Sequence, residues 1–164
     1  MKFRNAGLDD LPVIVAIYNS TIAGRMVTAD LKPVQVAEKI NWYNNHTADK
    51  RPLWMVETDE DEVIGWVSFQ DFYGRPAYAG TAEVSIYLDE KYRGKGFGKK
   101  ILEYVFTKCK GLCIDTLLGF IFAHNAASIQ MFMALGFEEW GHLKDIANMD
   151  GELCSLKIFG KKIF

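Results

Sequence analysis

Cysteine is scarce in this 164-residue sequence, and no pair of cysteines has the spacing of a metal site. The three cysteines, Cys109, Cys113 and Cys154, form no CxxC motif, and no histidine lies beside them at a ligand spacing. The N-terminus also lacks the apolar stretch of a secretory signal. We therefore expect free thiols, a cytoplasmic location and no bound metal.

Long apolar runs and an excess of positive charge are absent as well. No stretch of about 18 apolar residues could span a bilayer, and 19 basic residues against 21 acidic ones give a formal net charge of −2. Such a chain has no overall positive field for nucleic acid or anionic lipid, although a local basic loop can still bind a phosphorylated cofactor. We expect neither a membrane nor a nucleic acid as a partner.

Hydrophobic residues make up 49% of the chain and charged residues 24%, as in an ordinary packed domain. The patterning predicts a single α/β domain over residues 1–164 with a mixed sheet and no repeats or linkers. Strands are expected at residues 2–5, 53–57, 63–71, 81–88 and 114–123, with a closing hairpin from residue 137. Helices are expected from a cap at Asp9-Asp10 to Ile22, from Pro33 to Asn45, from Phe97 to Cys109 and from Asn125 to Gly136. The second helix should bury Val36, Ala37 and Ile40, and the fourth should bury Ile129, Phe132 and Met133.

Residues 81–88 alternate strictly, which predicts a strand with one buried face. The apolar positions are Ala82, Val84, Ile86 and Leu88, and the opposite positions are Glu83, Ser85 and Tyr87. The second face of this strand therefore carries a carboxylate, Glu83.

A basic, glycine-rich loop follows this strand and leads into a helix. Gly94, Gly96 and Gly98 stand at alternate positions, with basic residues at 93, 95, 99 and 100. Free backbone N–H groups and the helix dipole make an anion site, and the missing side chains let a pyrophosphate approach closely. The spacing fits neither a P-loop nor the dinucleotide-binding pattern. Such a loop can also be a plain flexible turn, but its place between strand and helix favours binding of a phosphorylated ligand.

Two segments resemble the signatures of the GCN5-related N-acetyltransferase (GNAT) superfamily. Arg93-Gly-Lys-Gly-Phe-Gly98 is similar to its Arg/Gln-x-x-Gly-x-Gly/Ala pyrophosphate loop, and Asn125-Ala-Ala-Ser128 with Leu135-Gly-Phe137 is similar to its second signature. Ile17-Tyr18-Asn19, Arg75-Pro-Ala-Tyr78 and Thr81-Ala-Glu83-Val-Ser-Ile-Tyr87 resemble the phosphinothricin acetyltransferase-like branch, whose members acetylate small amino-acid-like amines.

The resemblance implies the GNAT fold, with a central mixed, mostly antiparallel twisted sheet flanked by about four helices. It also implies acetyl-CoA as cosubstrate. The residues expected to bind it are Arg93, Gly94, Lys95, Gly96, Phe97, Gly98 and Lys99 in the loop, Ile86, Tyr87 and Leu88 on the strand, and Asn125 and Ser128. From the residues alone, Asn125 would be a helix cap and Ser128 an ordinary first-turn residue.

An amine must lose a proton before it can attack a thioester, so the site needs a base. By similarity, Glu83 is the expected general base, acting through a water. The alternative interpretations are that Glu83 is a solvated residue of a half-exposed sheet, or that it is a partner of Arg75.

Phe132 stands where many superfamily members have a tyrosine that protonates the CoA thiolate, and phenylalanine donates no proton. His124 and His142 are more often structural in such places.

The expected acceptor-binding residues are Arg75, Tyr78 and Thr28, with Arg75 pairing with the carboxylate of an amino-acid substrate. The leading hypothesis is an N-acetyltransferase acting on an amine of the phosphinothricin or methionine sulfoximine type. The alternatives are a protein or peptide N-acetyltransferase and a CoA-binding sensor without catalysis, the latter motivated by Phe132. A homodimer is common among similar proteins.

Overall fold

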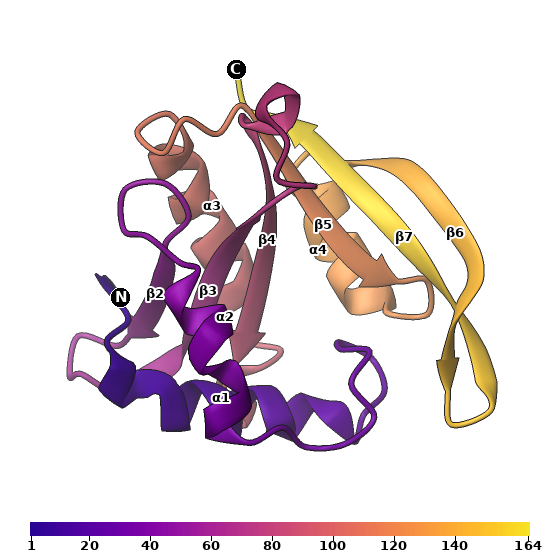
Figure 1. The fold of residues 1–164 in the computed structure, drawn as a ribbon, viewed down its shortest axis with the longest axis horizontal. Coiled ribbons are helices and arrows are strands. Elements are labelled where there is room, and N and C mark those ends of the chain that lie inside the picture. Colours follow the sequence, from indigo (N-terminus) through magenta and orange to yellow (C-terminus); the bar gives the residue numbers. More distant parts are fainter.

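Seven strands form one sheet in the order β1-β2-β3-β4-β5-β7-β6 in the computed structural model, which describes residues 1–164 (Figure 1). The strands are β1 (Lys2–Asn5), β2 (Leu53–Glu57), β3 (Val63–Asp71), β4 (Thr81–Leu88), β5 (Thr116–Phe122), β6 (Glu138–Met149) and β7 (Glu152–Lys162). All neighbouring strands are antiparallel except β4 and β5, which are parallel. The prediction of a mixed, mostly antiparallel sheet is confirmed.

Four α-helices cover the two faces of the sheet. They are α1 (Leu11–Ile22), α2 (Ile40–Asn44), α3 (Phe97–Cys109) and α4 (Ala126–Ala134). Short 3-10 turns at Leu8–Asp10, Val36–Lys39, Pro76–Tyr78 and Glu90–Tyr92 join them to the strands. None of the helices is long and apolar enough to cross a membrane.

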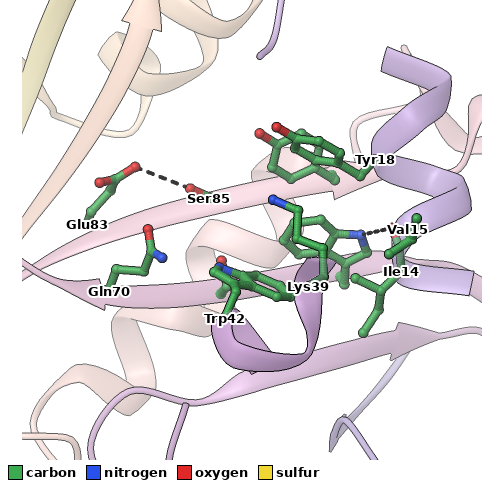
Figure 2. A pocket seen from close by; sticks show the side chains of 11 residues that line it. Ile14, Val15, Tyr18, Lys39, Trp42, Gln70, Glu83 and Ser85 are labelled. Carbon is green, nitrogen blue, oxygen red and sulfur yellow. Dashed lines mark hydrogen bonds between the residues drawn. The ribbon is translucent and has the colours of Figure 1, made fainter. Parts of the chain in front are cut away.

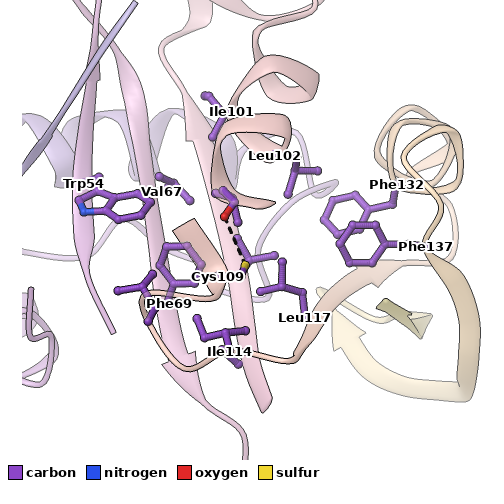
Figure 3. Close-up of a cluster of buried hydrophobic side chains, with 14 of the residues drawn as sticks. Trp54, Val67, Phe69, Ile101, Leu102, Cys109, Ile114, Leu117, Phe132 and Phe137 are labelled. Atoms are coloured by element: carbon purple, nitrogen blue, oxygen red, sulfur yellow. Dashed lines mark hydrogen bonds between the residues drawn. The ribbon is translucent and has the colours of Figure 1, made fainter. Parts of the chain in front are cut away.

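Two hydrophobic clusters hold the layers together. The larger cluster, with 18 buried residues, packs α3 and Phe132 of α4 against one face of the sheet, and Phe69, Leu102 and Leu117 lie in it (Figure 3). The smaller cluster, with seven buried residues, packs α1 against the opposite face around Trp66. The sheet is therefore buried on both faces, which accounts for the continuous apolar runs of β2 and β3.

The sheet splits between β4 and β5. Their pairing extends only from Thr81–Glu83 on β4 to Thr116–Leu118 on β5, although β4 continues to Leu88. Main-chain groups along a strand alternate in direction, and Thr81 and Asp89 both bond to the β3 side. The Val84 carbonyl and both main-chain groups of Ile86 therefore face the gap and have no strand partner, whereas the pairing of Glu83 with Leu118 engages the Val84 N–H.

The second helix differs from the prediction. It is a 3-10 turn followed by the five-residue α2, and both Val36 and Ile40 are exposed. Trp42 and Tyr43 pack against the smaller core cluster instead. The 3-10 turn changes the phase of the helix, and aromatic rings bury more apolar surface than valine or isoleucine, so they occupy the inner face.

Two further expectations on helices were wrong. Met133 of α4 is 59% exposed, whereas its neighbour Phe132 is buried. Asp10 does not cap α1 with its side chain; its carboxylate accepts a hydrogen bond from the Gly7 N–H at 2.7 Å and pairs with Arg4. Asp10 therefore closes the preceding 3-10 turn. In contrast, Asn125 caps α4 and Gly136 follows that helix with a φ of 79°, as predicted.

Candidate active site

Glu83 of β4 lines a cavity of about 220 Å³ between α1, α2, β3 and β4 (Figure 2). Because β4 alternates, Glu83, Ser85 and Tyr87 all point to this face, as the sequence predicts. The other lining residues are Ile14, Val15, Tyr18, Lys39, Trp42, Trp66, Ser68 and Gln70. Aromatic rings form one part of the wall, and Lys39, Ser68, Gln70 and Ser85 add polar groups beside the carboxylate.

The Glu83 carboxylate has no basic partner. No ion pair involves Glu83, and Arg75 does not contact it. Burial raises the pKa of Glu83, and a long hydrogen bond of 3.5 Å from the Ser85 hydroxyl lowers it by less. A desolvated carboxylate without a cation holds a proton more readily than an exposed one, which suits a general base.

Thr28 lies in the loop that follows α1, beside this cavity. It is buried, and its hydroxyl is 2.5 Å from the hydroxyl of Tyr18, which also donates to the Asp30 carboxylate. Burial, with a smaller contribution from Asp30, raises the pKa of Tyr18 to about 12. Thr28 thus ties the loop to α1, while burial keeps Tyr18 protonated at neutral pH.

Two more cavities adjoin the first and share Ser85 and Tyr87 with it. One of about 80 Å³ lies where β4 and β5 separate and reaches Ile86, Ser128 and Phe132. The other, of about 380 Å³, lies between the Thr28 loop and the β6–β7 hairpin and also touches Glu83. The Glu83 carboxylate therefore borders the two larger cavities, and both of them adjoin the cavity at the strand gap.

The three strand residues predicted to bind acetyl-CoA, Ile86, Tyr87 and Leu88, present different groups to the site. The main chain of Ile86 faces the gap, whereas Tyr87 pairs with Trp66 of β3 and offers only its side chain to the site. The carbonyl oxygen of Leu88 accepts a hydrogen bond from Arg93 Nε at 3.0 Å. Val84, which the sequence analysis did not select, has a free main-chain carbonyl at the gap.

The glycine loop presents six consecutive main-chain N–H groups, from Gly94 to Lys99, without a partner inside the protein. Gly94 and Gly96 have φ values of 70° and 80°, and a Cβ built at either position would meet nothing within 4 Å. This open, left-handed backbone at the start of α3 is an anion cradle. The loop residues are therefore gathered as the sequence predicts.

Arg93 and Gly98 also have structural contacts. The Arg93 guanidinium bonds to Leu88 O and to the Ser20 hydroxyl, so it links β4 to α1. Gly98 is buried, and a Cβ there would lie 2.7 Å from the Met131 sulfur. Gly98 thus lets α3 and α4 pack closely, a role that the glycine spacing alone did not indicate.

Asn125 uses both ends of its side chain within the protein. Its oxygen accepts from the Ser128 N–H at 3.1 Å, and its nitrogen donates to Met26 O at 2.9 Å. His124 Nε2 lies 2.8 Å from Arg25 O. These two residues tie the loop after α1 to the start of α4, so the loop covers the strand gap.

Arg75 and Tyr78 line none of the three cavities. Both are exposed in the connection between β3 and β4. Phe132 does reach the gap, but its ring packs on Gly119 and Phe137 within the larger core cluster. The structure thus separates Arg75 and Tyr78 from Glu83.

Sequence reasoning missed Lys39 and Trp42, which line the cavity with Glu83. They are three residues apart, a spacing that places both on one side of a helix. This spacing was visible in the sequence, but the prediction placed the apolar residues Val36 and Ile40 on the buried face instead.

The chain belongs to the GNAT acetyltransferase family. Residues 1–138 match the family model described as "Acetyltransferase (GNAT) domain". The chain is 48% identical over 163 residues to a Bacillus subtilis protein named "Putative phosphinothricin acetyltransferase YwnH", with 99% of each chain covered. The predictions of an acetyltransferase and of the GNAT resemblance are confirmed.

Two more distant relatives are also named as acetyltransferases. A Pseudomonas aeruginosa L-methionine sulfoximine/L-methionine sulfone acetyltransferase is 29% identical, with 94% of this chain and 90% of the relative covered. The crystal structure of a GNAT superfamily phosphinothricin acetyltransferase from Sinorhizobium meliloti, in complex with acetyl-CoA, has a TM-score of 0.89 at 28% identity and covers 98% and 87% of the two chains. The expectation of acetyl-CoA as the cosubstrate of this family is confirmed.

Proposed function

We propose that this enzyme acetylates the primary amine of a small amino-acid-like compound of the phosphinothricin or methionine sulfoximine type. The observation that carries the proposal is Glu83, a desolvated carboxylate without a cation, in a cavity that adjoins the strand gap. The names of the relatives support the substrate class.

The residues at the gap fit acetyl-CoA. The free N–H groups from Gly94 to Lys99 match the oxygens of a diphosphate, and the open space over Gly94 and Gly96 leaves room for it. The unpaired Val84 carbonyl and the unpaired main-chain groups of Ile86 can hydrogen-bond the amides of the pantetheine arm. When bound, acetyl-CoA supplies the acetyl group as an activated thioester.

Glu83 takes the proton of the acceptor amine, through a water, in this proposal. Its raised pKa, which results from partial burial of the carboxylate, improves it as a base. The Ser85 hydroxyl beside it holds the carboxylate in place. Phe132 supplies no proton, so a thiolate with a pKa near 8.5 departs without help from this position.

Turnover of an amine panel tests the proposal. Thiol release from acetyl-CoA should be seen with phosphinothricin, methionine sulfoximine or methionine sulfone. Glu83→Gln should lower kcat by about 10²-fold or more, while Gln70→Ala, which alters a neighbour on β3 in the same cavity, should lower it much less. An unchanged rate in Glu83→Gln would remove the assigned base.

The same panel separates the alternatives. Turnover of N-terminal peptides in preference to amino acids would favour a protein N-acetyltransferase. Tight acetyl-CoA binding in calorimetry, without transfer to any amine, would favour a sensor.

We propose further that the enzyme is a homodimer. The β6–β7 hairpin projects from the end of the sheet (Figure 1) and exposes the large apolar side chains of Trp140, Leu143, Ile146 and Leu153. Four exposed large apolar side chains on one hairpin favour contact with a second copy of the chain. Light scattering after gel filtration should give twice the mass of 18.6 kDa; a monomeric mass at micromolar concentration would contradict the proposal.

A further inference from the structure

Lys39 is the only lysine or arginine that lines any of the three cavities around Glu83. Its Nζ atom lies 4.6 Å from the centre of the Tyr18 ring and 5.7 Å from that of Trp42. No carboxylate pairs with it and no hydrogen bond engages it. Figure 2 shows the side chain reaching from the 3-10 turn before α2 into the cavity, toward the face of β4 that carries Ser85 and Glu83.

A half-buried ammonium without a counter-ion loses hydration that the protein must replace. The faces of Tyr18 and Trp42 replace part of it through cation–π attraction. These rings accept no conventional hydrogen bond, so the three N–H donors of the ammonium remain free for a ligand. The free ammonium therefore favours an anionic group in this part of the cavity.

The cavity thus has opposite charges at two places. Lys39 lies over the aromatic wall, and Glu83 lies farther along β4, with no ion pair between them. If the two charges neutralised each other, neither would be available to a ligand. Held apart, they match the two charges of an amino acid, whose ammonium and carboxylate groups share one carbon.

We propose that Lys39 binds the carboxylate of the acceptor amino acid and makes the enzyme selective for amines that bear an acid group. This inference rests on the proposed function. It gives Lys39 the part that the sequence analysis expected of Arg75, which lines none of the cavities. With the carboxylate at Lys39, the amine of the substrate is directed toward Glu83, where its proton is removed.

The same charge excludes another class of amine. A diamine or polyamine would place a second cation near Lys39, and like charges in a desolvated space repel each other strongly. The cavity of about 220 Å³ also suits a compact substrate. The substrate class is therefore amino acids without a second cationic group.

A pair of substrates that differ only in the carboxylate tests this role. Methionine sulfone carries the acid, and 3-(methylsulfonyl)propylamine is the same molecule without it. In Lys39→Met, which keeps the length of the stem and removes the charge, KM for methionine sulfone should rise by about 10- to 100-fold, the value of a hydrogen bond to a charged group. KM for the amine without the acid should stay the same or fall.

Two variants serve as controls. Lys39→Arg keeps the charge and should recover most of the preference for methionine sulfone. Lys110→Met removes an exposed lysine at the end of α3 that pairs with nothing, and it should leave both KM values unchanged. A general loss of folded protein lowers the turnover of both substrates together, so the ratio of the two KM values reports on the carboxylate alone.

Equal changes in KM for both substrates in Lys39→Met would overturn the role of Lys39 while leaving the proposed function intact. Failure of the unaltered enzyme to acetylate either compound would instead overturn the proposed function, and this inference with it. A preference of the unaltered enzyme for the amine without the acid would also contradict the inference.

Discussion

The side-chain nitrogen of Asn125 donates a hydrogen bond to the carbonyl oxygen of Met26, 99 residues earlier in the chain, at 2.9 Å. The oxygen of the same side chain caps α4 by accepting from the Ser128 N–H. One buried amide thus fixes both the start of α4 and the loop that covers the strand gap. Such a residue affects binding through the position of the loop, whether or not it touches the ligand.

Asn125→Ala and Asn125→Asp should therefore have different effects. Alanine removes the cap and the loop contact, and should lower the free energy of unfolding by about 1–3 kcal/mol. Aspartate keeps a capping oxygen but cannot donate to Met26 O, so it should mainly loosen the loop. Denaturant titration measures stability, and limited trypsin digestion at Arg25 measures loop opening; equal cleavage rates in Asn125→Asp and the unaltered enzyme would contradict this role.

Glu83→Gln should stabilise the protein while it impairs activity. Burial raises the pKa of Glu83, so the folded state binds a proton more tightly than the unfolded state, and the ionised carboxylate opposes folding at neutral pH. Glutamine removes this cost. The gain in Tm should be largest near pH 7 and should shrink as the pH falls toward about 4.3, where the unfolded glutamate is also protonated.

Thermal melts of both proteins between pH 4 and 8 measure this difference. Glu152→Gln is a suitable control, because Glu152 is exposed at the start of β7 and its carboxylate makes no hydrogen bond or ion pair. If Glu83→Gln instead melted below the unaltered enzyme at pH 7, and this deficit disappeared at low pH, Glu83 would have a lowered pKa and the desolvated base would be wrong.

Much of the fold was predictable because its signals are local. The alternation of residues 81–88 placed Glu83 opposite the core, and the Asp150-Gly151 turn, with φ values of 57° and 100°, closes the β6–β7 hairpin as expected. Each of these features depends on a few neighbouring residues. Tertiary packing does not override them.

Other features depend on contacts between distant segments, which no local pattern records. The aromatic residues of α2 displaced Val36 and Ile40 from the inner face because Trp66 lies opposite them. Likewise, Lys39 becomes a site residue only because the chain packs α2 and the turn before it against Trp66 of β3. Arg75 carried a motif resemblance, but the exposed β3–β4 connection places it away from the cavity.

Gly119→Ala should destabilise the larger core. A Cβ at Gly119 of β5 would lie 2.3 Å from the ring of buried Phe132, which is held by Phe137 on its other side. Overpacking of this kind costs about 1–3 kcal/mol, because the ring cannot move without disturbing α4. Urea titration measures the loss, and the double variant Gly119→Ala with Phe132→Leu should recover part of it by making room.

Gly96→Ala should weaken acetyl-CoA binding, and Gly74→Ala provides a matched control. Both glycines have positive φ values, 80° and 61°, and at both positions a Cβ would meet no atom within 4 Å. Each alanine therefore carries a similar backbone cost of about 1–2 kcal/mol.

Only Gly96 lies in the anion cradle, where the added methyl group would also stand in the path of the diphosphate. Gly96→Ala should thus raise KM for acetyl-CoA by about tenfold or more and leave KM for the amine unchanged, while Gly74→Ala should change stability alone. Steady-state kinetics with each substrate varied in turn distinguishes the two, and an equal KM for acetyl-CoA in both variants would mean that the diphosphate binds elsewhere.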